Sequence, residues 1–446
     1  MQARDPNPTA TPLMSAHPTS EAALTSALVK ATRRLVPFLL LLYVLAFLDR
    51  VNVGFAKVAM MADTGLSAAA YAFGAGLFFA GYALLEVPSN LILHRVGARR
   101  WLARIMVTWG LISAGMMFAW SETMFYTMRL LLGAAEAGFF PGVILYLTYW
   151  FPAAQRGRIL GMFYFGAPLA FIFGGPVSGW LMEMNGWLGL RGWQWMFLIE
   201  GALASVVGVW AYFYLTDRPA QAQWLAADER EALQSAVDSE ESAKCSTGSH
   251  RVRDLLSDRG VLHLCLIYFL IQISVYGVVF ALPSQVERLL GKSAGLQVGL
   301  VTAIPWICAL IAAYAVPRVV RGSRRKKGAV LVLLVAALGL AIAGQPQAIV
   351  ALSALCVAAA GFISVQPVFW TFPTERLSGA AAAGGIALIN SVGNLGGFFA
   401  PSLREWAEQT FASGSAGMWV LATSTCLAAI AMSALKNSPP IMSLEK

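Results

Sequence analysis

The chain has 446 residues, of which 58% are hydrophobic and only 12% are charged. Soluble domains carry roughly 25% charged residues, so this composition leaves too little polar surface for a water-soluble protein and predicts a membrane protein. The formal net charge is +9, but the basic residues gather in short loops between apolar stretches, as in membrane proteins generally, which makes nucleic-acid binding an unnecessary explanation.

The apolar stretches predict helices that cross a bilayer, which need about 20 mostly apolar residues each. Twelve follow one another along the chain: 35–60, 71–93, 101–120, 124–150, 159–182, 193–215, 261–283, 296–317, 328–344, 348–372, 379–402 and 416–435. We therefore expect an all-α membrane protein of twelve transmembrane helices.

Polar segments divide these spans into two groups of six. Residues 1–32 are rich in Pro, Ser and Thr and predict a disordered tail, which precedes a six-helix bundle over 33–215. Residues 216–258 form a polar central loop with an expected amphipathic helix at Ala226–Glu241. A second six-helix bundle over 259–436 and a short tail at 437–446 complete the chain. Loops after the second, fourth, eighth and tenth spans are the most basic, which places both termini in the cytoplasm.

The two halves repeat one pattern. A Gly-Phe pair is followed by a Phe-Pro pair and then by an arginine in each half, at Gly138, Phe151 and Arg156 and at Gly361, Phe372 and Arg376. Repeated halves are common in transporters, whose substrate sites lie near the membrane midplane.

Four runs carry a resemblance to a known family: Leu48–Phe55, Glu86–Trp101, Glu136–Gly142 and Asn390–Gly397. With these runs the chain from about 35 to 436 resembles the major facilitator superfamily, within it the anion:cation symporter family, and there the bacterial tartrate and phthalate permeases. The resemblance implies the major facilitator fold of two pseudo-repeated six-helix bundles, a bacterial inner membrane, and a monomer that carries a small organic anion with protons. It also implies a gating loop at Arg95, Gly97, Arg99 and Arg100, although His94 stands where the family's loop usually has an acid.

Charges inside the predicted spans point to a functional site, because a charge near the bilayer centre costs about 2.5–3.5 kcal/mol on insertion scales. Asp49 and Arg50 lie in the first span, and Arg129 and Glu136 share a face of the fourth. One interpretation is a neutral cluster that only holds the two helices together. Buried ion pairs stabilise proteins poorly compared with apolar packing, so we favour a substrate site.

In that site, arginine forks suit carboxylates, so Arg50 and Arg129 are the expected anion ligands. Glu136 is the expected proton carrier, with Asp49 as the second candidate, and the resemblance implies the same roles for the acid of the fourth helix and the arginine of the first. Polar and aromatic residues of other spans are expected to complete the substrate site, although each could instead bond a neighbouring helix: Tyr82, Gln272, Tyr276, Trp370, Asn390 and Asn394.

Two other functions fit parts of the sequence. An exporter would use the same fold with opposite flux, and the run Gly174–Gly179 partly resembles a motif of proton-coupled drug antiporters, but buried arginines disfavour cationic drugs. A membrane sensor would need a signalling domain. The chain has no nucleophile-elbow, phosphate-loop or metal-ligand pattern, so we expect neither an enzyme nor a bound cofactor.

Overall fold

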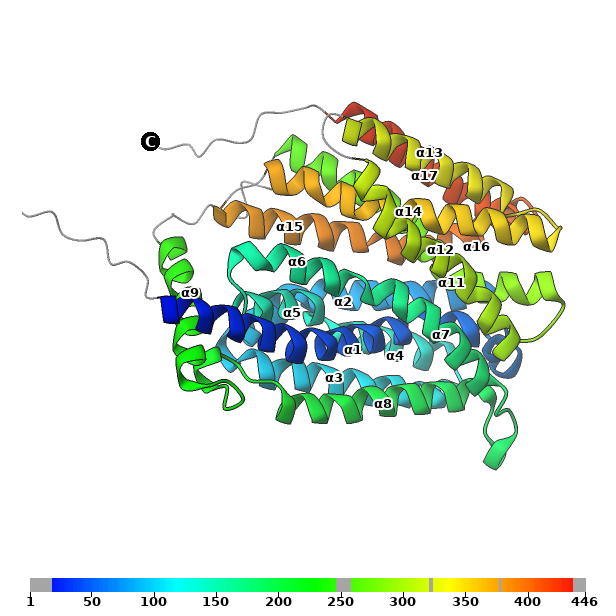
Figure 1. Ribbon diagram of the computed structural model, residues 1–446. Coiled ribbons are helices and arrows are strands. Elements are labelled where there is room, and N and C mark those ends of the chain that lie inside the picture. Colours follow the sequence, from blue (N-terminus) through cyan, green and yellow to red (C-terminus); the bar gives the residue numbers. More distant parts are fainter. Residues whose placement is uncertain (1–17, 246–257, 321–323, 377–378, 436–446) are drawn as a thin grey trace, which may run out of the picture.

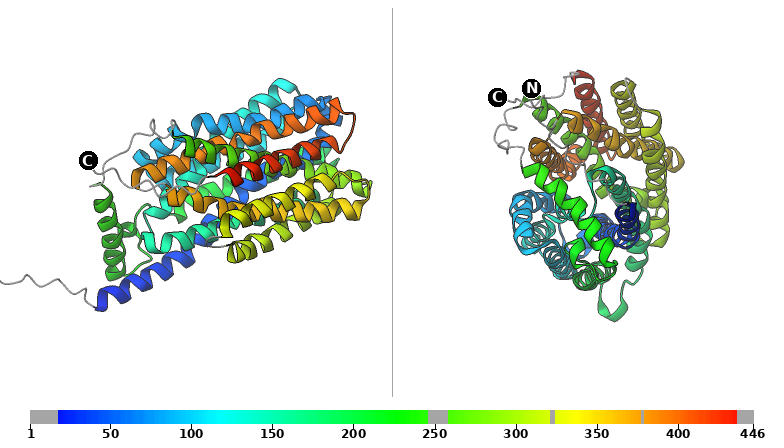
Figure 2. Two further views of the ribbon diagram at one scale, coloured as in Figure 1. Left: turned by 90° about the horizontal axis from the view of Figure 1, so that it is seen from above. Right: turned by 60° about the vertical axis from the view of Figure 1, so that its left-hand side comes forward.

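The computed structural model describes residues 18–245, 258–320, 324–376 and 379–435, and every regular element in these ranges is a helix. Figure 1 shows two groups of roughly parallel helices side by side, with one helix, α9, lying across one end. Figure 2 shows the same arrangement from above and towards that end. We call this end the α9 end and the opposite one the distal end.

The first bundle contains α1 (Pro18–Thr64), α2 (Ala68–Val96), α3 (Ala98–Gly115), α4 (Glu122–Glu136), α5 (Phe139–Thr148), α6 (Ala153–Tyr164), α7 (Gly166–Met182) and α8 (Gly192–Tyr214). After α9 (Ala227–Cys245), the second bundle contains α11 (Arg259–Leu290), α12 (Leu296–Val319), α13 (Arg325–Ile342), α14 (Ala348–Arg376), α15 (Gly379–Asn394), α16 (Gly396–Thr410) and α17 (Ala416–Ala434). Short 3-10 helices lie in connections: η1 (Met116–Phe118), η2 (Trp187–Gly189) and η3 (Pro219–Gln221).

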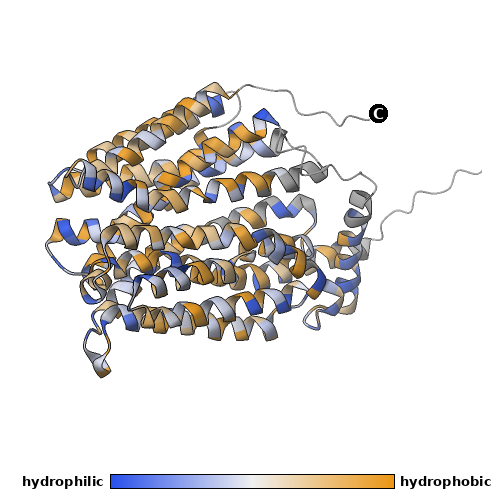
Figure 3. Ribbon diagram, turned by 180° about the vertical axis from the view of Figure 1, so that it is seen from behind, coloured by the Kyte–Doolittle hydropathy of each residue, from blue (hydrophilic) through white to orange (hydrophobic). Residues whose placement is uncertain are grey.

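The helices match the predicted spans, with breaks that the sequence pattern did not reveal. Ten helical stretches of the described residues are long and apolar enough to cross a membrane. The predicted span 328–344 corresponds to α13, which starts with three basic residues, and 379–402 corresponds to α15 and α16, divided at Leu395. Figure 3 shows hydrophobic residues along the helices and hydrophilic ones gathered at their ends and on α9. The all-α membrane fold is confirmed.

Polar caps fix several helix starts. The Ser67 hydroxyl accepts a hydrogen bond from the Ala70 N–H at 3.0 Å at the start of α2. The Asp258 carboxylate accepts from the N–H groups of Gly260 and Val261 at 2.6 and 3.0 Å at the start of α11. Such caps satisfy donors that a helix leaves unpaired in its first turn.

The prediction of a disordered tail is wrong for residues 18–32, which continue α1 at the α9 end. Ala23, Ala27 and Ala31 recur every four residues and are buried, so this extension has a narrow packing face. Its polar side binds α9, because Ser26 and Lys30 donate to the Glu229 carboxylate at 2.6 Å. Residues 1–17 and 437–446 lie outside the described residues.

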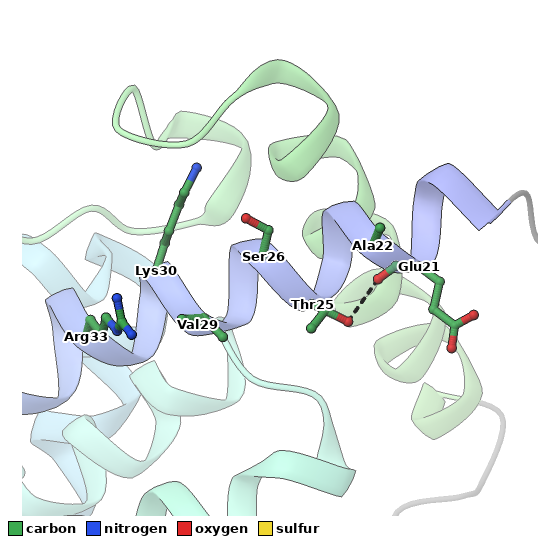
Figure 4. Close-up of a pocket in the computed structure, with 7 residues that line it drawn as sticks. All are labelled: Glu21, Ala22, Thr25, Ser26, Val29, Lys30 and Arg33. Carbon is green, nitrogen blue, oxygen red and sulfur yellow. Dashed lines mark hydrogen bonds between the residues drawn. The ribbon is translucent and has the colours of Figure 1, made fainter.

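A shallow groove runs along the α1 extension beside α9 (Figure 4). It is lined by Glu21, Ala22, Thr25, Ser26, Val29, Lys30 and Arg33. Arg33 precedes the charged residues of the first span by about 17 positions, or roughly 25 Å of helix. The groove is therefore separate from the candidate site in the bundles.

The two bundles touch where α7 packs on α12, α2 on α16 and α1 on α11. At the distal end the backbones meet at glycines: a Cβ on Gly179 would lie 2.3 Å from the Gly295 carbonyl oxygen, and one on Gly299 would lie 2.2 Å from that of Gly175. Lys57 of α1 also donates to Glu405 of α16 at 3.3 Å. The bundles are therefore closed against each other at this end.

Candidate functional site

Arg50 lies where the two bundles meet and binds to both. Its side chain is buried on α1, with Nε 3.1 Å from Oε1 of Glu136, and its Nη2 donates to the same oxygen. Its Nη1 donates to the Tyr276 hydroxyl of α11 at 3.3 Å. One guanidinium group thus holds an acid of the first bundle and a hydroxyl of the second.

Aromatic rings surround this guanidinium group. Its central carbon lies 4.6 Å from the ring centroid of Phe47, 5.3 Å from that of Phe78 and 5.4 Å from that of Tyr82. Rings at this range attract a cation through their π faces. They also exclude water, which strengthens any ion pair that Arg50 makes.

Glu136 owes its position to a break in the fourth span. It is the last residue of α4, and the backbone leaves the helix at Ala137 (ψ 132°) and Gly138 (φ +86°). A Cβ on Gly138 would lie 2.3 Å from Oγ of Ser89, so both the positive φ and the close approach of α2 require glycine here. Within the described residues, Oε2 of Glu136 has no hydrogen-bond partner, so this oxygen is free to take a proton.

Arg129 is buried beside this pair without joining it. Its Nη2 donates to the Ala75 carbonyl at 3.1 Å, and its guanidinium carbon lies 5.1 Å from the ring centroid of Phe78. Its Nε and Nη1 have no hydrogen-bond partner among the described residues. Arg129 is within electrostatic range of both Glu136 and Asp49, so it holds spare donors next to two acids.

Asp49, the second predicted proton carrier, bonds to partners other than the Arg50–Glu136 pair. It accepts hydrogen bonds from Trp109 at 2.5 Å and Ser113 at 2.7 Å on α3, and from Asn52 at 3.1 Å. Consecutive residues of a helix point about 100° apart, which is why Asp49 and Arg50 reach different neighbours.

The second bundle contributes a polar wall on α11. Tyr268, Gln272 and Tyr276 follow one another at four-residue spacing and therefore share a face. Gln272 donates to Asn394 of α15 at 3.2 Å, and Trp370 of α14 packs on the Tyr268 ring with centroids 5.0 Å apart. Three of the predicted residues, Gln272, Asn394 and Trp370, therefore lie along the face of α11 that carries Tyr276.

A second link between the bundles lies on α2. Ser391 of α15 donates to the buried Glu86 carboxylate at 2.6 Å. The predicted ligand Asn390 is the residue before Ser391 and is half-buried. This part of α15 therefore lies against α2.

The predicted gating loop joins α2 to α3 and is held by an acid that sequence reasoning missed. The Arg99 N–H donates to Asp217 at 2.8 Å, and a Cβ on Gly97 (φ +98°) would lie 3.1 Å from the same carboxylate. Arg95 and Arg100 are exposed. Asp217 thus gives the loop an acidic partner from just beyond α8.

Two buried acids within the predicted spans were also missed: Glu86 on α2 and Glu200 on α8. Each is an acid in an apolar stretch, the same signal that identified Asp49 and Glu136. Counting every acid in the predicted spans would have found both.

Comparison with known proteins fixes the family. A family model described as Major Facilitator Superfamily matches residues 39–401. The chain belongs to the major facilitator superfamily. It is therefore a multi-pass membrane transporter rather than an enzyme.

Similar proteins bear names that point to more than one kind of substrate. The chain is 50% identical to the inner membrane transport protein RhmT of Escherichia coli (90% of this chain, 93% of RhmT) and 47% identical to a putative tartrate transporter of Agrobacterium vitis (93% and 96%). It is 39% identical to a quinolone resistance transporter of Acinetobacter baumannii (87% and 90%). These relatives confirm the resemblance to the anion symporters and tartrate permeases.

The fold also matches solved structures. The xylose transporter XylE from E. coli, in an inward open conformation, superposes with a TM-score of 0.73 at 18% identity, over 92% of this chain and 96% of XylE. This likeness confirms the major facilitator fold.

Proposed function

We propose that the protein is a proton-coupled symporter that imports an organic anion across the bacterial inner membrane, as a monomer. The observation that carries the proposal is the buried Arg50 guanidinium, shared between Glu136 of one bundle and Tyr276 of the other. An arginine in this position can exchange its internal carboxylate for that of a substrate. The names of the relatives from E. coli and A. vitis support an inner membrane and a carboxylate such as tartrate. Sugar acids and aromatic carboxylates remain within the proposed class.

Charge balance couples the proton to the anion. In the empty carrier Glu136 neutralises Arg50. A substrate carboxylate that binds Arg50 displaces Glu136, and a buried carboxylate without a partner is costly, so Glu136 takes up a proton. Proton and anion then favour each other's binding, and this coupling is reciprocal.

The remaining residues divide between the two bundles. Arg129 supplies further donors to the anion, and Tyr82 lines the first bundle. Gln272, Asn394, Trp370 and Asn390 supply hydrogen bonds and a ring face from the second. Aromatic and polar groups together suit a hydroxylated or an aromatic acid.

Alternating access requires the bundles to separate at one end at a time. We assign the α9 end to the cytoplasm because its loops are the most basic. The distal glycine contacts close the periplasmic side, so the site opens next towards the cytoplasm once the Glu86–Ser391 link breaks. Release of the anion and proton there completes import.

Uptake into proteoliposomes tests the proposal. A panel of radiolabelled tartrate, sugar acids and aromatic carboxylates is offered with an imposed pH gradient, acid outside. At least one carboxylate should accumulate above its external concentration, and a protonophore should abolish the gain. Carboxylate uptake that is equal with and without the gradient would rule out proton symport.

An exporter of the same fold is the second candidate, because one relative is named as a quinolone resistance transporter. Such an exporter would be a proton antiporter, in which protons that enter the cell drive the substrate out. Accumulation of a quinolone in inverted vesicles, with no carboxylate uptake in either orientation, would favour that function.

A further inference from the structure

Glu200 is a buried acid that the proposed mechanism leaves unused. This residue of α8 is 2% exposed. Oε1 accepts from the Ser178 hydroxyl of α7 at 2.8 Å, and Oε2 accepts from the Asn52 amide of α1 at 3.0 Å. Both partners are neutral.

Asn52 joins Glu200 to Asp49. The same Nδ2 atom donates to Oδ1 of Asp49 at 3.1 Å and to Glu200 at 3.0 Å. Trp109 and Ser113 of α3 also donate hydrogen bonds to the Asp49 carboxylate. Two carboxyl groups from two helices therefore meet around one amide, inside the first bundle.

Too few cations face this pair for both acids to be charged. Arg129 is within electrostatic range of Asp49 and also of Glu136, whereas Arg50 is bound to Glu136. The groups from α1, α3 and α7 that bond Glu200 or Asp49 are neutral: Asn52, Trp109, Ser113 and Ser178. Asp49, Glu136 and Glu200 are three acids against the two guanidinium groups, and the buried Glu86 of α2 is a further acid within electrostatic range of Arg50. This excess of acids requires at least one bound proton, since a buried unpaired carboxylate is costly.

We infer that Glu200 is a second proton-carrying residue of the carrier, coupled to Asp49 through Asn52. This inference rests on the proposed symport and adds a site to it. When an anion draws Arg129 towards itself, Asp49 loses its guanidinium neighbour, and the pair takes up a further proton from water as a new carboxyl O–H bond. The proton returns to water when Arg129 turns back after the anion has left. Glu200 itself does not contact the anion.

Glu200→Gln tests the role, because the amide keeps the size of the side chain and cannot titrate. Counterflow of a carboxylate between equal pools should stay within about twofold of the unsubstituted carrier. Accumulation driven by the pH gradient should fall at least about fivefold, with a flatter dependence on external pH between about 5 and 8. Glu122→Gln, at an exposed helix start, is the matched control and should change neither. Full accumulation with an unaltered pH profile in Glu200→Gln would show that Glu200 only holds helices together and carries no proton.

Ser178→Ala gives a second test if Glu200→Gln folds poorly. Removing the hydroxyl that donates to the carboxylate disfavours its charged form, so the pH profile should move to higher pH. An unmoved profile would overturn the inference.

An infrared measurement separates this inference from the proposed function, because it needs no substrate. The pH-dependent carboxyl C=O band of the purified carrier should lose one component in Glu200→Gln. An unchanged band would contradict titration of Glu200. Loss of the component in a carrier that accumulates no carboxylate would leave Glu200 as a proton site and refute only the symport.

Discussion

The Arg50 guanidinium donates to Glu136 through two of its nitrogens and to Tyr276 through the third. A lysine could keep the charge but not this planar fork. The geometry of the group, and not only its sign, therefore connects the bundles.

Arg50→Lys should raise the KM for a transported carboxylate at least about tenfold, which equals about 1.4 kcal/mol of lost binding. Initial uptake rates in proteoliposomes over a range of concentrations measure this. Arg191→Lys is the control, because Arg191 pairs with Asp63 at 3.6 Å and its side chain is 52% exposed. Equal KM values for the two variants would show that Arg50 does not bind the anion.

Site residues could be predicted from the sequence where a charged residue stands inside an apolar span. Arg50 and Glu136 were identified as site residues in this way, and their pairing came from the structure. The hydrogen bonds from Trp109 and Ser113 of α3 to Asp49 were not predicted, because residue spacing within a helix gives direction only relative to its neighbours and the packing of α3 was unknown. Asp217 lies beyond the end of a predicted span, in a polar loop where an acidic residue is ordinary and gives no signal of a functional contact.

At the scale of helices, the break between α4 and α5 sets the position of Glu136. Gly138→Ala should destabilise the protein by roughly 1–3 kcal/mol, because alanine strains the positive φ and its Cβ meets Ser89. Thermal unfolding in detergent measures the loss. Gly161→Ala is the control, since nothing lies within 4 Å of a Cβ there. Equal melting temperatures for the two variants would contradict this role of the break.

The contact between the α1 extension and α9 should depend on pH. Lys30, then Ser26 and the Ala226 N–H, lower the pKa of Glu229 from its ordinary 4.5 to about 2. A lowered pKa means that the contact stabilises the fold fully above pH 4.5 and is lost as the pH falls towards 2. Since Lys30 is half exposed, the gain is that of a surface pair, about 0.2–1 kcal/mol.

Glu229→Gln should therefore lower the melting temperature slightly at pH 7, and the difference from the unsubstituted protein should vanish as the pH approaches 2. Asp228→Asn, next to it on α9, serves as the control. A difference that grows on acidification would have the wrong sign for this contact.

The helices were more predictable than their interruptions. Apolar length alone located the spans, because only helices of about 20 residues satisfy their backbone groups in lipid. The extension of α1 was missed, because its alanine face is too weakly apolar to stand out from a polar tail. The breaks at Gly138 and Leu395 depend on close contacts with other helices, which no single stretch of sequence contains.

At the scale of the whole molecule, the two bundles are joined by glycine contacts at the distal end and by the Arg50–Tyr276 and Glu86–Ser391 bonds further in. Backbone contacts at glycines can separate without rearranging side chains. The inner bonds depend on the charge state of the acids, so loading of the site can change which end is closed.

Glu136→Gln tests the coupling between charge and transport most directly. Without a titratable group opposite Arg50, the carrier should still exchange labelled carboxylate between two equal pools, because both loaded states remain neutral. It should no longer accumulate the carboxylate when a pH gradient is imposed. Exchange that persists while accumulation is lost is the predicted result. Accumulation equal to that of the unsubstituted carrier would show that Glu136 does not carry the coupled proton, and would contradict the account.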